Sequence, residues 1–437
     1  MTTELLLPAG NLEKMRAAYA YGADAVYAGL PRYSLRARNN EFRQEQLAAG
    51  MAEARALGKK FYITCNILPH DDKVRSFVRQ LQPLIELQPD ALIMADPGLI
   101  MLAREAWPDL AIHLSVQANT LNQAAVRFWQ GLGLRRIILS RELSLHEIGG
   151  IRQACPDIEL EVFVHGALCI AYSGRCLLSG YFNRRDPNQG TCTNACRWDY
   201  KVHAGEEDTS ALSGFSWQSE LEQPLQAMER HPLADRIYLI EERERPGELM
   251  PIEEDEHGTY IMNSRDLRAV EQVAALVALG VNSLKIEGRT KSLYYVARTA
   301  QVYRQAIDDA QAGRPFDARL LSELDGLAHR GYTTGFLERQ RSDATQNYAT
   351  GSSQQGHSQF VGQVLSQHEG WALVDVKNRF AIGDTLLIIH PQGNRELRLE
   401  QMHDEQGAPV QVAAGNGHKV RIPLDAADTR TLLARRA

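Results

Sequence analysis

Four cysteines in one short stretch are the residues of this chain best suited to chemistry. They are Cys169, Cys176, Cys192 and Cys196. These four of the chain's six cysteines fall within 28 of its 437 residues, whereas Cys65 and Cys155 stand alone in apolar surroundings. Thiolates gathered round one centre select zinc, Cu(I) or an iron–sulfur cluster. The stretch therefore predicts a metal centre.

The spacing of these cysteines, C-x6-C-x15-C-x3-C, favours an iron–sulfur cluster over zinc. Structural zinc sites place their ligands in pairs about two to four residues apart, and only the last pair fits this loosely. An iron–sulfur cluster is larger and accepts wider, irregular spacing. Two disulfides, or four unrelated buried thiols, remain the alternatives, but they suit a reducing cytosol poorly.

A cytoplasmic location is expected because the first residues lack a secretory signal and no apolar run is long enough to span a membrane. The net charge of −6 argues against an overall basic coat for nucleic acid, although a local basic patch is compatible with it. Neither a G-x-G-x-x-G nor a G-x4-G-K-[ST] motif supports a dinucleotide or nucleotide site. The run HEIGG at His146 lacks the second histidine of a zinc protease, and no G-x-S-x-G elbow occurs.

The first part of the chain alternates short apolar runs with amphipathic runs, which is typical of β/α units on a parallel sheet. The expected strands are Glu4–Leu7, Ala25–Ala28, Phe61–Asn66, Ala91–Ala95, Ile112–Gln117, Arg136–Ser140, Leu160–His165 and Ser283–Glu287. Eight strands in strict alternation predict an α/β fold of the TIM-like (β/α)8 barrel type. An open doubly wound sheet is the alternative.

The seventh unit is predicted to carry a long insertion after its strand, at about residues 166–262, that includes the cysteines. Its helix is expected to begin after an N-cap at Ser264. The barrel domain would span residues 1–337, and a polar linker would follow at 338–358. Six short strands with turn signals predict a small antiparallel β-barrel domain over residues 359–437.

The carboxyl ends of barrel strands, where such folds place their active sites, carry several cations and amides. The candidate substrate-binding residues are Arg36, Arg38, Asn40, Gln117 and Arg289, and the same mouth carries Arg141 and Lys285. Arginine forks bind carboxylate and phosphate, so we expect an anionic substrate, unless these arginines pair with acids on a wet rim. His165 and Glu287 are candidates for proton transfer, although a structural histidine and a partner for Arg289 are equally ordinary roles.

The stretch EVFVHGALCIAYSGRCLLS, residues 161–179, resembles the signature of the collagenase-like peptidase U32 family. The resemblance extends through ELLLPAG, YGADAVYAG, NNEF, LSVQANT and IEGRTKS into the C-terminal domain, and so covers essentially the whole chain. Family members of this kind bind a four-iron, four-sulfur cluster through four cysteines, which implies that role for Cys169, Cys176, Cys192 and Cys196.

The resemblance is closest to a bacterial subgroup that acts on tRNA. It implies 5-hydroxylation of the wobble uridine, with prephenate as the hydroxyl donor and tRNA as the partner. Other relatives hydroxylate rRNA or act in quinone synthesis, and these targets are the alternatives. Peptidase activity is the older family label, and the motifs above give it little support. Prephenate, a dicarboxylate, and tRNA, a polyanion, both suit an arginine-rich mouth.

Overall fold

The computed structural model describes residues 2–30, 32–35, 42–168, 265–329, 331–338, 358–425 and 428–436, and four short strands between residues 238 and 259. Those four strands form two hairpins, β8 (Tyr238–Glu241) with β9 (Leu249–Ile252) and β10 (Glu254–Asp255) with β11 (Gly258–Thr259). The predicted insertion at 166–262 and the linker at 338–358 lie largely outside the described residues, so the domain boundaries stay predictions.

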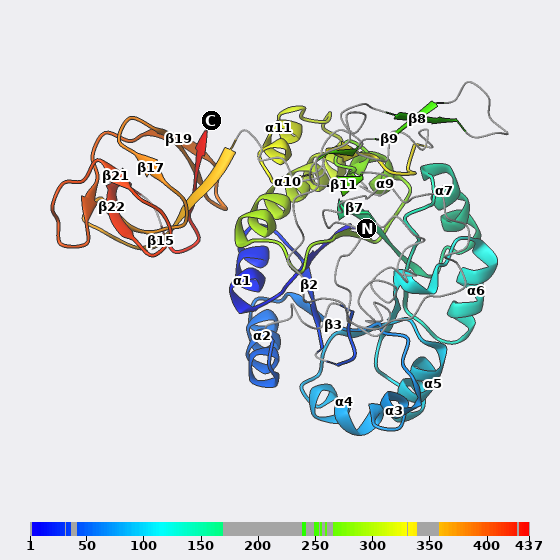
Figure 1. Ribbon diagram of the computed structural model, residues 1–437. Helices are drawn as coiled ribbons and strands as arrows, with labels where there is room; N and C mark the ends of the chain where they lie inside the picture. Colours follow the sequence, from blue (N-terminus) through cyan, green and yellow to red (C-terminus); the bar gives the residue numbers. More distant parts are fainter. Residues whose placement is uncertain are drawn as a thin grey trace, which may run out of the picture.

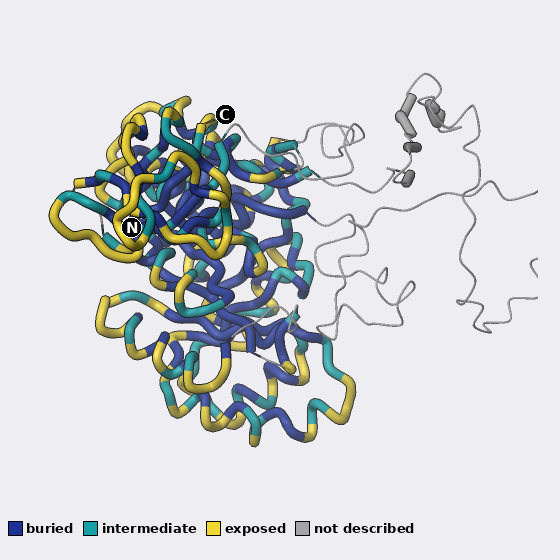
Figure 2. The backbone as a smooth tube through the Cα atoms, turned by 60° about the vertical axis from the view of Figure 1, so that its left-hand side comes forward, coloured by how far each residue is buried: buried dark blue, intermediate teal, exposed yellow. Residues whose placement is uncertain are grey.

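Eight parallel strands form a closed barrel, as predicted (Figure 1). They are β1 (Glu4–Pro8), β2 (Ala25–Gly29), β3 (Lys60–Cys65), β4 (Ala91–Met94), β5 (Ile112–Leu114), β6 (Arg136–Ile138), β7 (Glu159–Ala167) and β13 (Ser283–Ile286). Each strand pairs with its neighbour in sequence, and the pairing of β13 with both β7 and β1 closes the ring. The strands are buried, as Figure 2 shows in dark blue, because helices cover their outer faces.

An outer ring of helices surrounds the barrel (Figure 1). They are α1 (Leu12–Ala20), α2 (Gln44–Ala56), α3 (Asp71–Val74), α4 (Phe77–Ile85), α5 (Pro97–Ala106), α6 (Gln123–Gly131), α7 (Leu145–Ala154), α9 (Val273–Ala278), α10 (Leu293–Gln311) and α11 (Arg319–Asp325). Side-chain caps fix where several of them begin: Ser144 accepts a hydrogen bond from the Glu147 amide, and Ser292 does the same for Tyr295. These two caps fix the ends of the loops that lead from β6 into α7 and from β13 into α10.

The prediction for the start of the seventh helix is wrong. Residues Asp266–Arg268 form a strand, β12, that pairs antiparallel with the end of β7, and helix α9 begins only at Val273. Strand β7 has nine residues, more than any other barrel strand, and its end extends beyond the ring. The backbone groups of His165, Gly166 and Ala167 need hydrogen-bond partners, and β12 supplies them along one edge of the strand. The expected cap, Ser264, lies outside the described residues.

The C-terminal region forms the predicted antiparallel β domain, a seven-stranded sheet curled into a half-barrel. Its strands, in sheet order, are β19 (Arg395–Arg398), β18 (Thr385–Ile389), β23 (Leu432–Arg436), β15 (Ser358–His368), β16 (Trp371–Val376), β22 (Lys419–Pro423) and β20 (His403–Asp404). Strands β17 (Phe380–Ala381) and β21 (Val412–Ala413) form a separate pair. The sequence did not predict β23, although it lies near the centre of the sheet.

The β domain packs against α1 and α10 of the barrel (Figure 1). The Tyr21 hydroxyl, just after α1, lies 2.9 Å from the Ile389 carbonyl and 2.7 Å from the Arg430 carbonyl. On α10, the Tyr294 ring stacks on Phe360 with 5.2 Å between centroids. Ile389 belongs to the same buried apolar cluster as the barrel core, so the two domains share part of their interior.

Candidate functional site

A pocket of about 90 Å³ opens at the carboxyl ends of the barrel strands, where barrels of this type place their active sites. Its lining comes from most of the strands and the loops that follow them. The described lining residues are Tyr27, Leu35, Thr64, Asn66, Ile93, Ser115, Val116, Gln117, Ile138, Arg141, Phe163, Lys285, Glu287 and Arg289. Three of them are cations and one is a carboxylate, so the described lining carries a net positive charge.

Lys285, on β13, points into the barrel and connects the pocket with the charged interior beneath it. Its Nζ donates a hydrogen bond of 2.8 Å to Glu161 Oε1 on the neighbouring strand β7. The same ammonium lies 4.4 Å from the centre of the Tyr27 ring and 5.3 Å from that of Phe163. Burial lowers the pKa of Lys285, and the Glu161 carboxylate opposes that shift.

Below Lys285, a buried network of charges fills this layer of the barrel. Arg136 on β6 donates to Glu4 at 2.5 Å and to Glu161 at 3.1 Å. Glu4 also accepts hydrogen bonds from the Tyr62 and Ser283 hydroxyls. Burial is the largest single effect and alone would raise the pKa of Glu4, but the Arg136 charge and the hydrogen bonds from Arg136, Tyr62 and Ser283 together lower it. Two carboxylates and two cations therefore balance inside the barrel.

Arg141, in the loop after β6, lies at the side of the pocket. Its guanidinium carbon sits 3.9 Å from the centre of the Phe163 ring, and its Nη2 lies 3.7 Å from Glu287 Oε2. Glu287 in turn lies 3.5 Å from the Tyr27 hydroxyl, which is also 2.9 Å from the Ile286 carbonyl. The loop after β6, the middle of β7 and the loop after β13 thus bring a cation, an aromatic face and a carboxylate together.

Arg289, beyond β13, reaches across the pocket to the loop after β2. Its Nη2 donates to the Leu35 carbonyl at 2.7 Å, and its Nη1 lies 3.4 Å from Ser34 Oγ. A Cβ at Gly29 would lie 2.3 Å from that Nη1, so only glycine leaves room for the guanidinium. Arg289 ties two loops together as well as lining the pocket.

Another part of the pocket wall carries neutral polar groups that follow β3 and β5. The Asn66 amide accepts from the Leu35 backbone at 3.2 Å and donates to Ser115 Oγ at 3.2 Å. Gln117 is buried in the short 3₁₀ helix Val116–Ala118 that follows β5. Amide groups offer both donors and acceptors, so this wall suits a neutral hydrogen-bonding ligand such as a base edge.

Three of the candidate site residues, Gln117, Glu287 and Arg289, line this pocket. Arg36, Arg38 and Asn40 lie outside the described residues, as do the four cysteines of the predicted cluster. Sequence reasoning missed Glu161, Arg136 and Phe163. A signal for the two charged residues existed, since a charge inside a short apolar strand has to find a partner within the barrel.

His165, the other proton-transfer candidate, is not among the described residues that line the pocket. Its ring lies on the helix side of β7, within 5.4 to 5.7 Å of the rings of Tyr295, Tyr303 and Tyr332. Nδ1 lies 3.2 Å from the Tyr303 hydroxyl. Burial and nearby cations lower the pKa of His165 to about 3, so the ring is neutral at physiological pH. These contacts describe a structural histidine, and a catalytic role stays a prediction without geometric support.

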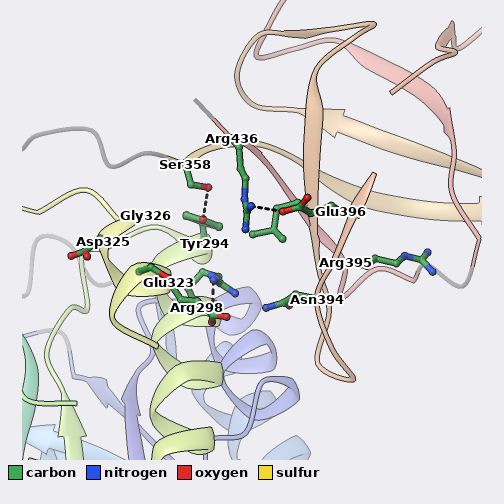
Figure 3. Close-up of a pocket in the computed structure, with 12 residues that line it drawn as sticks. Tyr294, Arg298, Glu323, Asp325, Gly326, Ser358, Asn394, Arg395, Glu396 and Arg436 are labelled. Carbon is green, nitrogen blue, oxygen red and sulfur yellow. Dashed lines mark hydrogen bonds and ion pairs between the residues drawn. The ribbon is translucent and has the colours of Figure 1, made fainter. Parts of the chain in front are cut away.

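A larger cavity, of about 620 Å³, lies between the barrel and the β domain (Figure 3). Its charges pair with one another: Arg298 with Glu323, and Arg436 with Glu396. The Arg395 guanidinium points away from the cavity and contacts the Asp425 carbonyl. We take the smaller pocket at the barrel mouth as the candidate site for an anionic ligand, because only its described lining has an excess of cations.

Comparison with known proteins decides the family. The model for peptidase family U32 matches residues 10–347, and the model for the U32 C-terminal domain matches residues 357–435. The chain belongs to peptidase family U32. Among U32 relatives, tRNA hydroxylation protein P of Escherichia coli is 58% identical over 96% of this chain and 93% of its own length.

Two further U32 relatives also carry names that refer to hydroxylation. The protein of the same name from Haemophilus influenzae is 56% identical over 97% of this chain and 94% of its own length. The 23S rRNA 5-hydroxycytidine C2501 synthase of Escherichia coli is 30% identical over 78% of this chain but only 46% of its own length. The described residues of this U32 protein contain no helix long and apolar enough to cross a membrane, and no group of three metal-ligating side chains.

Proposed function

We propose that this protein hydroxylates tRNA, at C5 of the wobble uridine, with prephenate as the hydroxyl donor. The observation that carries the proposal is 58% identity, over nearly the whole chain, to a tRNA hydroxylation protein. The described pocket supports it, since its cations suit a dicarboxylate and its amides suit a pyrimidine. The neutral wall of Asn66 and Gln117 would receive the base, once it had been splayed out of the anticodon loop.

The chemistry asks for a proton acceptor and for exclusion of water. Replacing the C5 hydrogen of uridine by hydroxyl is a two-electron oxidation of the base, so the hydroxyl donor has to accept two electrons. Glu287 is the only carboxylate among the described lining residues, and it would receive a proton released in the pocket. The Tyr27 and Phe163 rings would shield the reacting groups from water.

We also propose that Cys169, Cys176, Cys192 and Cys196 hold a four-iron, four-sulfur cluster. Support comes from their grouping in the sequence and from Leu168, the residue before Cys169, which lies just beyond the end of β7 on the mouth side of the barrel. A bound cluster would supply electron transfer or Lewis acidity at that end of the barrel. The pocket residues described above would bind and orient the reactants.

Deletion of the gene tests the proposed function. Nucleosides of tRNA derived from 5-hydroxyuridine should disappear from cells grown at low oxygen, and the wild-type gene should restore them. Unchanged tRNA nucleosides would reject the proposal. Hydroxylation of rRNA is the second candidate, because the relative that is 30% identical carries that name. In that case the missing nucleoside would be found in the large-subunit rRNA of the same cells.

The cluster proposal predicts that Cys192→Ser lowers the iron content of protein purified without air, from about four irons per chain. Cys155→Ser is the matched control, since Cys155 is a buried, free thiol at the end of α7. Iron and acid-labile sulfide should fall in the first variant and stay at the wild-type level in the second. Equal iron loss in both variants would refute the ligand assignment.

A further inference from the structure

The guanidinium N–H groups of Arg141 donate no hydrogen bond within the described part of the chain, unlike the other cations of the pocket, although the side chain is only 9% exposed. Its contacts there are the Phe163 ring and the Glu287 carboxylate at 3.7 Å, which is beyond hydrogen-bond distance. By contrast, Lys285 donates to Glu161 and Arg289 donates to the Leu35 carbonyl.

A guanidinium that is nine-tenths buried and has five N–H donors needs an acceptor, because an unsatisfied buried charge is unfavourable. Stacking on Phe163 fixes the guanidinium plane and occupies one of its faces. The N–H groups lie in that plane, so an edge with two parallel donors is left for a planar acceptor. A carboxylate matches such an edge with two hydrogen bonds.

The strand order of the barrel brings two of the pocket's cations and an aromatic ring together. Arg141, Phe163 and Lys285 come from β6, β7 and β13, which are consecutive neighbours in the ring. Asn66 and Ser115 follow β3 and β5, and β5 is the next neighbour of β6 in the ring. Arg141 and Lys285 therefore form one cationic cluster on consecutive strands, and Arg289 lies apart from it, beside Leu35 and the amides.

The cationic cluster of Arg141 and Lys285 is suited to a small molecule more than to the tRNA backbone. Its cations are buried in the barrel mouth, whereas proteins usually contact nucleic-acid phosphates with exposed lysines and arginines. A uracil base is neutral and has no need of this charge. We infer that Arg141, stacked on Phe163, is the residue that binds a carboxylate of the small anionic co-substrate, and that Lys285 adds its positive charge from below.

This inference rests on the proposed function, in which prephenate is the hydroxyl donor. Glu287 has a defined place in it: the carboxylate that lies near Arg141 in this structure is displaced from the guanidinium when a ligand carboxylate takes the two donors. Binding of the co-substrate then removes Arg141 from the surroundings of the Glu287 carboxylate. This exchange is expected because the Glu287 carboxylate and the ligand carboxylate compete for the same guanidinium.

The test measures binding of prephenate to the full-length, anaerobically purified protein by titration calorimetry. Arg141→Gln should weaken binding by about 30-fold or more, since truncating one partner of a buried, hydrogen-bonded charge pair has an effect of about 2 kcal/mol or more. Arg141→Lys keeps the charge but loses the two-pronged geometry, so binding should weaken by about tenfold. The lysine variant remains informative if the glutamine variant does not fold.

Arg135→Gln is the matched control. Arg135 is exposed and directly precedes β6, so it lies at the amino end of the barrel strands, away from the pocket. Arg135→Gln removes one positive charge, as Arg141→Gln does, and this variant should bind prephenate like the wild type. All variants should bind tRNA with wild-type affinity, measured by fluorescence anisotropy.

The outcomes separate this inference from the proposed function. If Arg141→Gln binds prephenate like the wild type, or if it weakens tRNA binding and leaves prephenate binding intact, the carboxylate assignment is overturned even where wild-type protein hydroxylates tRNA. If Arg141 controls prephenate binding but deletion of the gene leaves tRNA nucleosides unchanged, the carboxylate site stands and the proposed function falls. If the wild type does not bind prephenate, the inference is overturned.

Discussion

Glu161 and Lys285 couple the stability of the barrel to its pocket. The pair is buried, and Arg136 and Glu4 extend it to two positive and two negative charges. Removing one member leaves the others unbalanced in a medium that solvates charge poorly, which is far more destabilising than losing a surface ion pair. Glu161→Gln should therefore lower the free energy of unfolding at pH 7 by about 2 to 4 kcal/mol.

The deficit of Glu161→Gln should shrink as the pH rises. Burial already lowers the pKa of Lys285, and loss of Glu161 removes the main group that opposes this shift, so the pKa falls further in the variant. Above that lowered value the folded variant carries a neutral amine, while the unfolded chain stays protonated up to about pH 10.4. The unfolded state then binds more protons, so the stability of the variant rises with pH.

Urea unfolding at pH 7 and at pH 9.5 would measure this recovery. Glu159→Gln is a suitable control, because Glu159 is a half-exposed partner of the same Arg136 at the edge of the network. Its effect should be small and should not depend on pH over this range. A deficit in Glu161→Gln that is equal at both pH values would show that Lys285 keeps its proton in the folded variant.

At the scale of elements, the eight barrel strands could be predicted because each is a short apolar run between helical patterns, and burial on both faces produces that pattern directly. Strand β12 could not be predicted in this way. Asp266–Arg268 has no strand-like composition, and its conformation comes from pairing with the protruding end of β7. Such pairing is a property of the tertiary structure and overrides local preference.

The site was predictable in part for the same reason. Strand ends are visible in the sequence, so Gln117, Glu287 and Arg289 could be placed at the mouth of the barrel. Which of them meet depends on closure of the ring, since only the pairing of β13 with β7 brings Lys285 beside Phe163. Gly166 allows these strands to approach at the mouth: its φ is +106°, and a Cβ there would lie 2.6 Å from the Glu287 carbonyl. The sequence shows that glycine but not the residue it faces.

At the scale of the whole molecule, the β domain is held to the barrel by both apolar and polar contacts. Leu432 and Ala434 of β23 belong with Ile389 to the apolar cluster of the barrel. Gln301 on α10 and Asn394 exchange two amide hydrogen bonds, of 3.0 and 3.1 Å. A domain attached only by a linker would need none of these contacts, so we expect the two domains to unfold together.

Calorimetry of the wild-type protein should therefore show one cooperative thermal transition. The double variant Tyr21→Phe with Ile389→Ala removes a hydroxyl that donates to the Ile389 and Arg430 carbonyls and leaves a small cavity at the junction. These changes cost about 1 to 3 and about 2 to 5 kcal/mol respectively. The loss falls on the contacts that couple the two domains, so the single transition should split into two. Tyr19→Phe is the control, because the Tyr19 hydroxyl donates to the Lys60 carbonyl within the barrel. It should lower the melting temperature and preserve one transition, whereas two transitions in the wild type would mean that the junction contributes little and that the β domain moves independently.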